Sequence, residues 1–214
     1  MPRPLADCRL YTFIDTAYLD GRSPVGVTRQ LCDGGSDLIQ LRAKNLPKAE
    51  VRAIVESMAP VTEDAGVHLI INDYPDIAQS LPSPFVHLGQ EDFFEHGYSQ
   101  ASDLFPDSPR PMIGLSTHEP SQCQRAIEAG ADYVAIGPVY ATGTKPTAKP
   151  ATLNYVRWAA AHVNIPWFAI GGINLETLSE VLSAGARRIC IVSAILQHEH
   201  PDKACQSIRQ LLPS

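Results

Sequence analysis

Short apolar runs separated by longer mixed segments form the main pattern of the chain. The runs are rich in β-branched and aromatic residues, and Gly, Pro or Asp bounds most of them, which is typical of strands buried on both faces. Eight strands are predicted, at residues 9–15, 37–42, 68–72, 85–89, 111–116, 133–139, 166–170 and 188–192.

The mixed segments carry apolar positions at helical spacing. The clearest one begins at Pro47 and places Val51, Ile54, Val55 and Met58 on one face. Helices are predicted at residues 24–32, 47–59, 121–129, 153–162, 175–183 and 202–212.

Strands that alternate with helices in this way favour a single parallel sheet. Right-handed crossovers can close eight such strands, so the predicted fold is α/β, a (β/α)8 TIM barrel that residues 1–214 form as one domain. An open doubly wound sheet is the alternative, but no G-x-G-x-x-G follows the first strand. The segment 94–110 leaves room only for a short helix near 99–104, so a regular fourth helix stays open.

The composition is that of an ordinary globular protein. Of 214 residues, 44% are hydrophobic and 19% are charged, and a single α/β barrel takes roughly 200 to 250 residues. The net charge of -6 and the lack of a Lys/Arg cluster disfavour nucleic acid as a partner. No stretch approaches the roughly 18 apolar residues of a membrane helix, and Asp7 stands where a signal peptide needs an apolar core. We therefore expect a cytoplasmic protein with small-molecule partners; a homo-oligomer stays compatible with the sequence.

Polar side chains gather where the predicted strands end. In a TIM barrel the reactive groups lie at the C-terminal ends of the strands, so we expect these segments to meet at one rim. Seven consecutive strand ends carry them: QLRAK at 40–44, IND at 71–73, HLGQED at 87–92, GLSTH at 114–118, DYVAIGPVYATGTK at 132–145, AIGGI at 169–173 and VSAI at 192–195.

The segment from 142 to 145 has the composition of an oxyanion site. Gly143 lets backbone N–H groups approach a ligand, Thr142 and Thr144 donate through their hydroxyls, and Lys145 supplies a positive charge. A flexible polar loop is the alternative, because such compositions are common.

Taken in order, these segments resemble the thiamine-phosphate synthase family. GQED together with T-x-T-K and Q-x-R-x-K is the specific part of the resemblance, whereas GGI and VSAI occur in many phosphate-binding barrels. Enzymes of that family join a hydroxymethylpyrimidine diphosphate to a thiazole phosphate, or its carboxylated form. The resemblance therefore implies a transferase that forms a C–N bond, releases pyrophosphate and yields thiamine phosphate.

Asp73 and Asp92 are the candidate metal ligands. They follow the third and fourth strands, where carboxylate oxygens could hold one Mg²⁺ that keeps several waters and bridges a diphosphate. Each aspartate alone suits a turn or a helix cap equally well, but the pair matches the family motif.

Cationic and amide side chains complete the expected diphosphate pocket. Arg42, Lys44 and Lys145 would neutralise the diphosphate and the charge that builds as it leaves. Gln40 and Asn72 would supply amide donors and acceptors beside the pyrimidine. A solvated rim is the alternative reading of the cations, since exposed Lys and Arg are common.

The resemblance also implies roles for hydroxyl groups and backbone groups. Ser116 lacks a G-x-S-x-G elbow, which disfavours acyl transfer, and would hydrogen-bond the pyrimidine diphosphate. Thr142 and Thr144 would bind the thiazole substrate. His87 and His118 could be ligands or bases, although lone histidines of this kind are more often structural. The thiazole phosphate would lie in a cradle formed by Gly172, Val192 and Ser193.

Leaving-group chemistry suggests a dissociative substitution. Mg²⁺ and the three cations would stabilise departing pyrophosphate, the aminopyrimidine would spread the positive charge on its methylene carbon, and the thiazole nitrogen would capture that carbon. No covalent enzyme intermediate is needed. The catalytic positions are then Arg42, Lys44, Ser116 and Lys145.

Three positions depart from the usual family pattern. Ala43 stands where an acidic residue is common, Tyr74 where arginine is common, and Ala141 where proline is common. None of them removes a proposed ligand, so they bear on affinity or loop closure rather than on the reaction.

Three other functions stay compatible with the sequence. A TenI-like thiazole tautomerase shares the phosphate cradle but tends to lack the metal and diphosphate groups present here. A barrel lyase or aldolase would use Lys44 or Lys145 as a Schiff base. A non-catalytic regulator would bind thiazole phosphate without releasing pyrophosphate.

Overall fold

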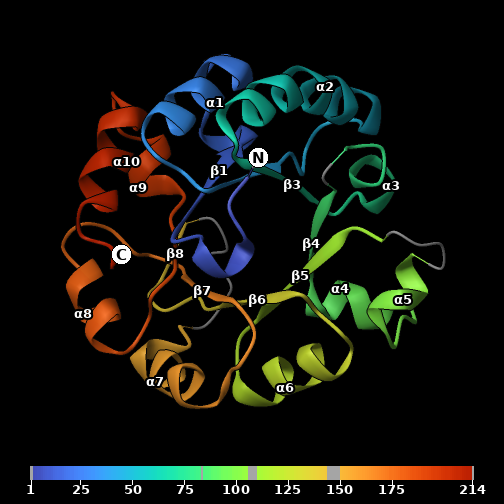
Figure 1. Cartoon of the computed structure of the whole chain (residues 1–214), viewed down its shortest axis with the longest axis vertical. Helices are drawn as coiled ribbons and strands as arrows, with labels where there is room; N and C mark the ends of the chain where they lie inside the picture. Colours follow the sequence, from blue (N-terminus) through green and yellow to red (C-terminus); the bar gives the residue numbers. More distant parts are fainter. Residues whose placement is uncertain (1, 83, 106–109, 144–149, 214) are drawn as a thin grey trace.

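The strands of the chain form a closed barrel (Figure 1). The computed structural model describes residues 2–82, 84–105, 110–143 and 150–213. Within these ranges eight parallel strands pair in chain order and β8 pairs back with β1, which confirms the predicted (β/α)8 TIM barrel. The strands are β1 (Leu10–Asp15), β2 (Leu38–Arg42), β3 (His68–Asn72), β4 (Phe85–Gly89), β5 (Met112–Thr117), β6 (Tyr133–Ile136), β7 (Trp167–Ile170) and β8 (Ile189–Cys190).

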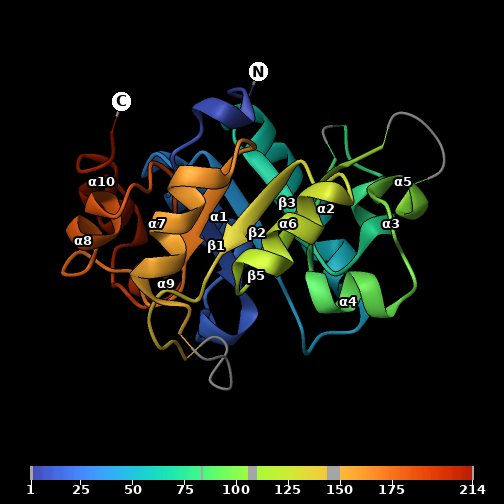
Figure 2. The same cartoon turned by 90° about the horizontal axis from the view of Figure 1, so that it is seen from below.

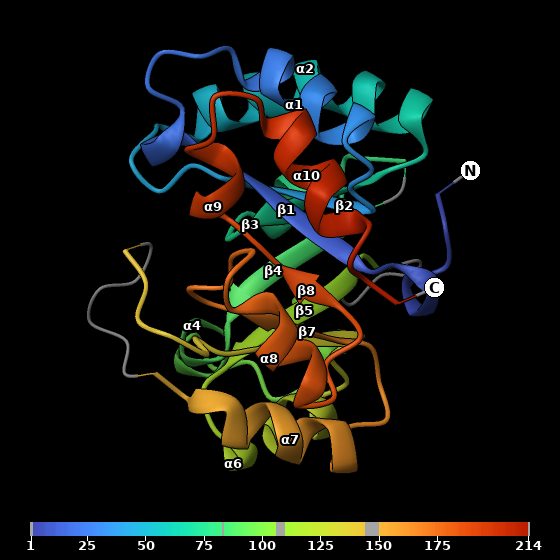
Figure 3. The ribbon, with the colours of Figure 1, turned by 90° about the vertical axis from the view of Figure 1, so that its left-hand side faces the viewer.

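Helices surround the barrel as an outer ring (Figure 1). Figure 3 shows α10 beside α1, and the two helices approach closely at Gly34, where an added Cβ would lie 2.5 Å from Cys205 Cβ. The helices are η1 (Leu5–Asp7), η2 (Thr16–Tyr18), α1 (Pro24–Asp33), α2 (Lys48–Ala65), α3 (Pro75–Ala78), α4 (Gln90–Glu95), α5 (Ala101–Leu104), α6 (Pro120–Glu128), α7 (Thr152–His162), α8 (Leu178–Ser183), α9 (Ser193–Leu196) and α10 (Pro201–Arg209).

Helix α2 is longer than predicted. The expected end at residue 59 was wrong, because the helix continues to Ala65 through Pro60. Pro60 lacks a backbone N–H but lies on the exposed face, and the buried Thr62 continues the row that faces the core. Gly66 ends the helix in the left-handed conformation, with φ 65°, as is usual for a C-terminal glycine.

Two strands are shorter than predicted. The run 133–139 forms a strand only to Ile136, because the chain then passes close over β7: a Cβ on Gly137 would lie 2.1 Å from the Ile170 carbonyl oxygen. The run 188–192 is a strand only at its centre, since Val192 already caps the first turn of α9.

The irregular connection between β4 and β5 contains short helices. α4 begins directly after β4 and buries Phe93, and α5 opens with a capping box between Gln100 and Asp103. The short helix expected near 99–104 is therefore confirmed as α5. α4 was not predicted, because so short a helix with few buried residues leaves no clear periodicity. Residues 106–109 lie outside the described part.

Aromatic side chains fill the middle of the barrel. Tyr11 and Tyr133 both meet Phe168 edge-on, with ring centroids 5.3 and 5.9 Å apart. Gly114 makes room for this packing, because an added Cβ would lie 2.0 Å from the Tyr133 ring. The barrel is thus a packed core.

The two ends of the barrel differ. Figure 2 shows both chain termini at one end, whereas η2, α4 and residues 137–143 after β6 lie at the other. The latter end is where the strands finish, so the predicted polar segments gather there. In the described ranges, no helix is both long and apolar enough to cross a membrane.

Candidate active site

A pocket opens at the C-terminal end of the barrel. Its empty volume is about 910 Å³, including space open to solvent. Every predicted site residue that the structure describes lines this pocket: Gln40, Arg42, Lys44, Asn72, Asp73, Asp92, Ser116, Thr142, Gly172, Val192 and Ser193. Groups far apart in the sequence therefore meet at one rim, as the barrel requires.

Two predicted site residues lie outside the described residues. Thr144 and Lys145 belong to the segment 144–149, so the structure does not test where they lie. Thr142 is described, and it lines the pocket.

A buried carboxylate holds Arg42 at the pocket wall. Arg42 ends β2 beside Asp15, which ends β1, and Arg42 Nη1 lies 2.7 Å from Asp15 Oδ2. Asp15 is only 1% exposed, and its other oxygen accepts a hydrogen bond from the Ala17 backbone N–H. Asp15 was not predicted as a site residue. The one feature of the sequence that could have indicated a role in the site was the position of Asp15 at the end of the first predicted strand.

Lys44 and Asp73 form an ion pair at the rim. Lys44 Nζ lies 2.6 Å from Asp73 Oδ2, and both side chains are partly exposed. Asp73 has φ 66°, a conformation that costs free energy for a residue other than glycine. Its backbone N–H donates to the carbonyl oxygen of His87 on β4, which helps to hold that conformation.

Asp92 lies in the first turn of α4. Its carboxylate folds back over Gly89, where an added Cβ would come within 2.8 Å of Asp92 Oδ2. Asp73, directly after β3, and Asp92, in the helix after the neighbouring β4, therefore line the same pocket. In the described ranges, no group of three or more His, Cys, Asp or Glu side chains is arranged to hold a metal. A cation at this pair would need ligands from substrate and water as well.

The glycines after β7 let two loops approach each other. Gly172 has φ 67°, and an added Cβ would lie 2.7 Å from the Ala141 carbonyl oxygen. Tyr140 donates its backbone N–H to the Gly171 carbonyl oxygen at 3.0 Å. Only glycine fits at position 172. Its lack of a side chain lets the loop after β6 lie against the expected phosphate cradle.

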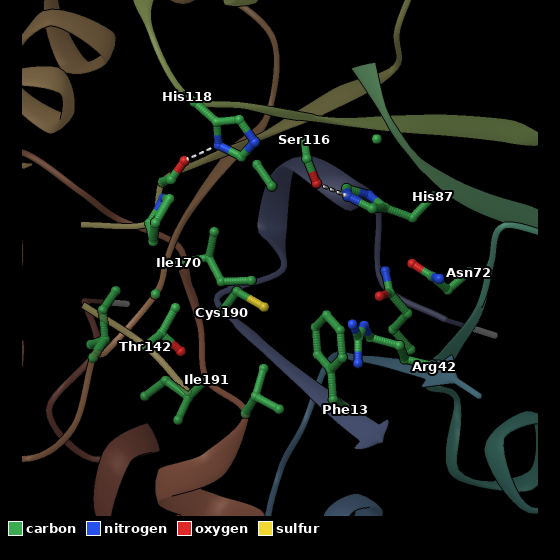
Figure 4. Close-up of a pocket in the computed structure, with 18 of the residues that line it drawn as sticks. Phe13, Arg42, Asn72, His87, Ser116, His118, Thr142, Ile170, Cys190 and Ile191 are labelled. Carbon is green, nitrogen blue, oxygen red and sulfur yellow. Dashed lines mark hydrogen bonds between the residues drawn. The ribbon is translucent and has the colours of Figure 1, made fainter. Parts of the chain in front are cut away.

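The two walls of the pocket differ in character. Figure 4 shows Arg42, Asn72 and Ser116 on one side, and Thr142 and Ile191 on the other. The first wall suits a charged substrate with hydrogen-bonding groups. The second is more apolar and suits a ring.

Ser116 belongs to a series of hydrogen bonds that the sequence did not reveal. Its hydroxyl lies 2.9 Å from His87 Nε2 (Figure 4), and His87 Nδ1 lies 3.1 Å from the hydroxyl of Tyr133. Burial raises the pKa of Tyr133 above its ordinary value, so its hydroxyl stays protonated. His118 is bound instead to the backbone carbonyl of Gly137 through Nδ1.

A family model described as thiamine monophosphate synthase matches residues 10–195. The chain belongs to this family. The thiamine-phosphate synthase of Thermus thermophilus is 43% identical over 190 residues, covering 86% of this chain and 87% of the relative. That of Lawsonia intracellularis is 37% identical over 213 residues, covering 99% and 96%.

A solved structure of the same family agrees with the fold. The thiamine phosphate pyrophosphorylase from Pyrococcus furiosus matches with a TM-score of 0.84 and 29% identity, covering 96% of each chain. A structure of 3-hexulose-6-phosphate synthase has a TM-score of 0.60 at 19% identity, and this likeness shows the fold alone. The predicted family is confirmed, and with it an enzyme of thiamine biosynthesis.

Proposed function

We propose that the pocket condenses a hydroxymethylpyrimidine diphosphate with a thiazole phosphate, or its carboxylated form, to give thiamine phosphate and pyrophosphate. The observation that carries the proposal is that two groups of residues, each suited to bind an anion, line one pocket. Cations and acids at or after the ends of β2, β3 and β4 face Gly172 after β7 and Val192 and Ser193 after β8. Two phosphorylated substrates can meet between them.

Arg42 and Lys44 would bind the diphosphate. A guanidinium has five N–H donors, and Asp15 engages Arg42 through Nη1, so donors remain for phosphate oxygens. Because Asp15 is buried, it fixes the guanidinium before substrate arrives and reduces the ordering that binding requires. Gln40 and Asn72 would contact the pyrimidine from the same wall.

Asp73 and Asp92 would hold Mg²⁺ together with the diphosphate. The donor set fits, because Mg²⁺ commonly takes one or two carboxylates and completes its shell with waters and substrate phosphates. The ion pair between Lys44 and Asp73 supports this assignment, since it shows that the Asp73 carboxylate is accessible to a cation. When bound, Mg²⁺ would neutralise charge that develops on the leaving pyrophosphate.

The thiazole phosphate would lie against the opposite wall. Gly172, Val192 and Ser193 would receive its phosphate, and Thr142 with Thr144 would contact the ring portion. Gly172 is suited to this role because its conformation and the close loop leave no space for a side chain. The apolar side chains of this wall, including Ile191, would pack on the ring.

The chemistry needs positioning and charge stabilisation rather than a protein nucleophile. Arg42, Lys44 and Lys145 would stabilise the negative charge of the departing pyrophosphate, and Ser116 would bond the diphosphate substrate. The aminopyrimidine would carry the positive charge until the thiazole nitrogen forms the new C–N bond. Holding both substrates in one pocket supplies much of the acceleration. We expect this enzyme to act on small molecules in the cytoplasm.

A coupling assay tests the proposed function. The protein is mixed with both substrates and Mg²⁺, and pyrophosphate and thiamine phosphate are measured together, with a control that omits the metal. We expect equal amounts of the two products, and loss of both without Mg²⁺. Binding of thiazole phosphate without release of pyrophosphate would identify a regulator. Isomerisation of the thiazole alone would identify a tautomerase.

A further inference from the structure

Five polar side chains form a continuous hydrogen-bonded series across the barrel interior, here called the Gln40–Ser116 series. Gln40 Nε2 donates to the Tyr11 hydroxyl at 2.5 Å, and the hydroxyls of Tyr11 and Tyr133 lie 3.3 Å apart. The Tyr133 hydroxyl lies 3.1 Å from His87 Nδ1, and His87 Nε2 lies 2.9 Å from Ser116 Oγ. The series joins two pocket residues, Gln40 and Ser116, through side chains of β1, β6 and β4.

Burial of the series determines which atom donates in each of its hydrogen bonds. Tyr11, Tyr133 and His87 are at most 5% exposed, and the tyrosine rings pack against Phe168. A buried hydroxyl proton without an acceptor costs free energy, so each hydroxyl must donate to its neighbour. Burial also raises the pKa of Tyr11 and Tyr133, which keeps both hydroxyls protonated.

The amide of Gln40 sets the direction of the whole series. Gln40 Nε2 can only donate, so the Tyr11 oxygen accepts its hydrogen bond. The Tyr11 hydroxyl then donates its own proton in a hydrogen bond to the Tyr133 oxygen. Tyr133 then donates to His87 Nδ1, which must be unprotonated. A neutral imidazole with a bare Nδ1 carries its proton on Nε2, and this proton is donated to Ser116 Oγ.

We propose that the Gln40–Ser116 series holds His87 in the Nε2–H tautomer and thereby turns the Ser116 hydroxyl into a hydrogen-bond donor toward the pocket. The acceptor is an anionic oxygen of the diphosphate substrate, and this part rests on the proposed function. Tyr11, Tyr133 and His87 are positioning residues that act through Ser116. If the series ran in the opposite direction, Ser116 would donate its proton to His87 Nε2. The Ser116 oxygen would then present only a lone pair to the pocket, and a lone pair repels an anion.

The tautomer of His87 can be measured without any substrate. The protein is labelled with ¹⁵N-histidine, and the ring nitrogens are observed by NMR, with the His87→Gln variant identifying the signals of His87. We expect a protonated Nε2 and a bare Nδ1. A proton on Nδ1 would overturn the proposal. Because no substrate is present, this result does not depend on the reaction that the enzyme catalyses.

Removing one hydroxyl from the series tests its effect on turnover. Tyr133→Phe takes away the donor to Nδ1, so we expect a mixture of His87 tautomers and a roughly tenfold lower kcat/KM. Tyr155→Phe is the matched control, because Tyr155 is also a buried tyrosine but bonds Thr117, outside the series. Wild-type tautomer and kcat/KM in Tyr133→Phe, or equal losses in both variants, would contradict the proposal.

A second pair of variants keeps the test valid if Tyr133→Phe fails to fold. His87→Gln can place an amide donor toward Ser116, whereas His87→Ala cannot. We expect His87→Gln to keep at least about tenfold more activity than His87→Ala. Equal activity would show that donation to Ser116 is unimportant. A wild-type protein that forms no thiamine phosphate would instead refute the proposed function and leave the tautomer measurement standing.

Discussion

At the scale of residues, most site residues at the ends of strands could be predicted from the sequence, whereas those deeper inside the strands could not. Candidates at strand ends were predictable, because polar groups after an apolar run stand out, and every described one lines the pocket. The hydrogen-bonding role of Tyr11 and Tyr133 was not predicted, since a tyrosine inside an apolar run is typical of a residue that only packs in the core. Asp15 was missed because its importance lies in a partner, Arg42, that is distant in the sequence.

The pairing of Asp15 with Arg42 predicts a specific effect of Asp15→Asn. The guanidinium loses its charged partner and becomes less ordered, so we expect kcat/KM for the pyrimidine diphosphate to fall roughly 10- to 100-fold. Steady-state kinetics with this substrate varied provides the measurement.

Asp37→Asn is the matched control for that variant. Asp37 is also a buried aspartate paired with an arginine, Arg209, but it precedes β2 and so lies at the other end of the barrel. We expect its substitution to lower the thermal midpoint without changing kcat/KM. Equal kinetic effects in the two variants would mean that Asp15 acts only on stability.

Lys145 carries a prediction that comes from the sequence alone. If it stabilises the departing pyrophosphate, Lys145→Ala should lower kcat by about 10²- to 10³-fold while the circular dichroism spectrum stays unchanged. Lys48→Ala is the control, because Lys48 lies on α2 and pairs with Asp76. Near-normal turnover of Lys145→Ala would refute the assigned role.

At the scale of elements, regular strands and helices were predicted well and short connections were not. β3 and β4 have the predicted bounds, because each is a short, mostly apolar run with a clear end, Asn72 in β3 and Gly89 in β4. α3 and α4 escaped prediction, since a helix of one or two turns has too few buried positions to show a period. The early end of β6 depends on its contact with β7, which the sequence does not display.

Strand β5 contains a glycine that the packing of the interior requires. In Gly114→Ala the added methyl would lie 2.0 Å from the Tyr133 ring, so we expect a loss of at least about 1–3 kcal/mol in the free energy of unfolding, measured with urea. Gly26→Ala in α1 is the control, since its Cβ would make only an ordinary contact at 3.5 Å. Unchanged stability of Gly114→Ala would contradict this account of the interior.

At the scale of the whole molecule, closure of the barrel is what creates the site. The count of eight strands predicted that closure, and closure brings the ends of β2, β3 and β4 opposite those of β6, β7 and β8. The width and shape of the pocket could not be predicted, because they depend on which side chains point inward and how loops approach at Gly172. The central claim is therefore that one pocket has two separate anion-binding regions.

Calorimetric titration of wild type, Asp92→Asn and Ser193→Ala tests that claim most directly. Each protein is titrated with pyrophosphate in the presence of Mg²⁺ and with thiazole phosphate, and wild type is also titrated with each ligand in the presence of a saturating amount of the other. We predict that wild type binds both ligands at once, that Asp92→Asn weakens only pyrophosphate and that Ser193→Ala weakens only thiazole phosphate, each by roughly tenfold. Mutual exclusion of the two ligands in wild type, or equal weakening of both by each variant, would mean a single anion site and would contradict the account.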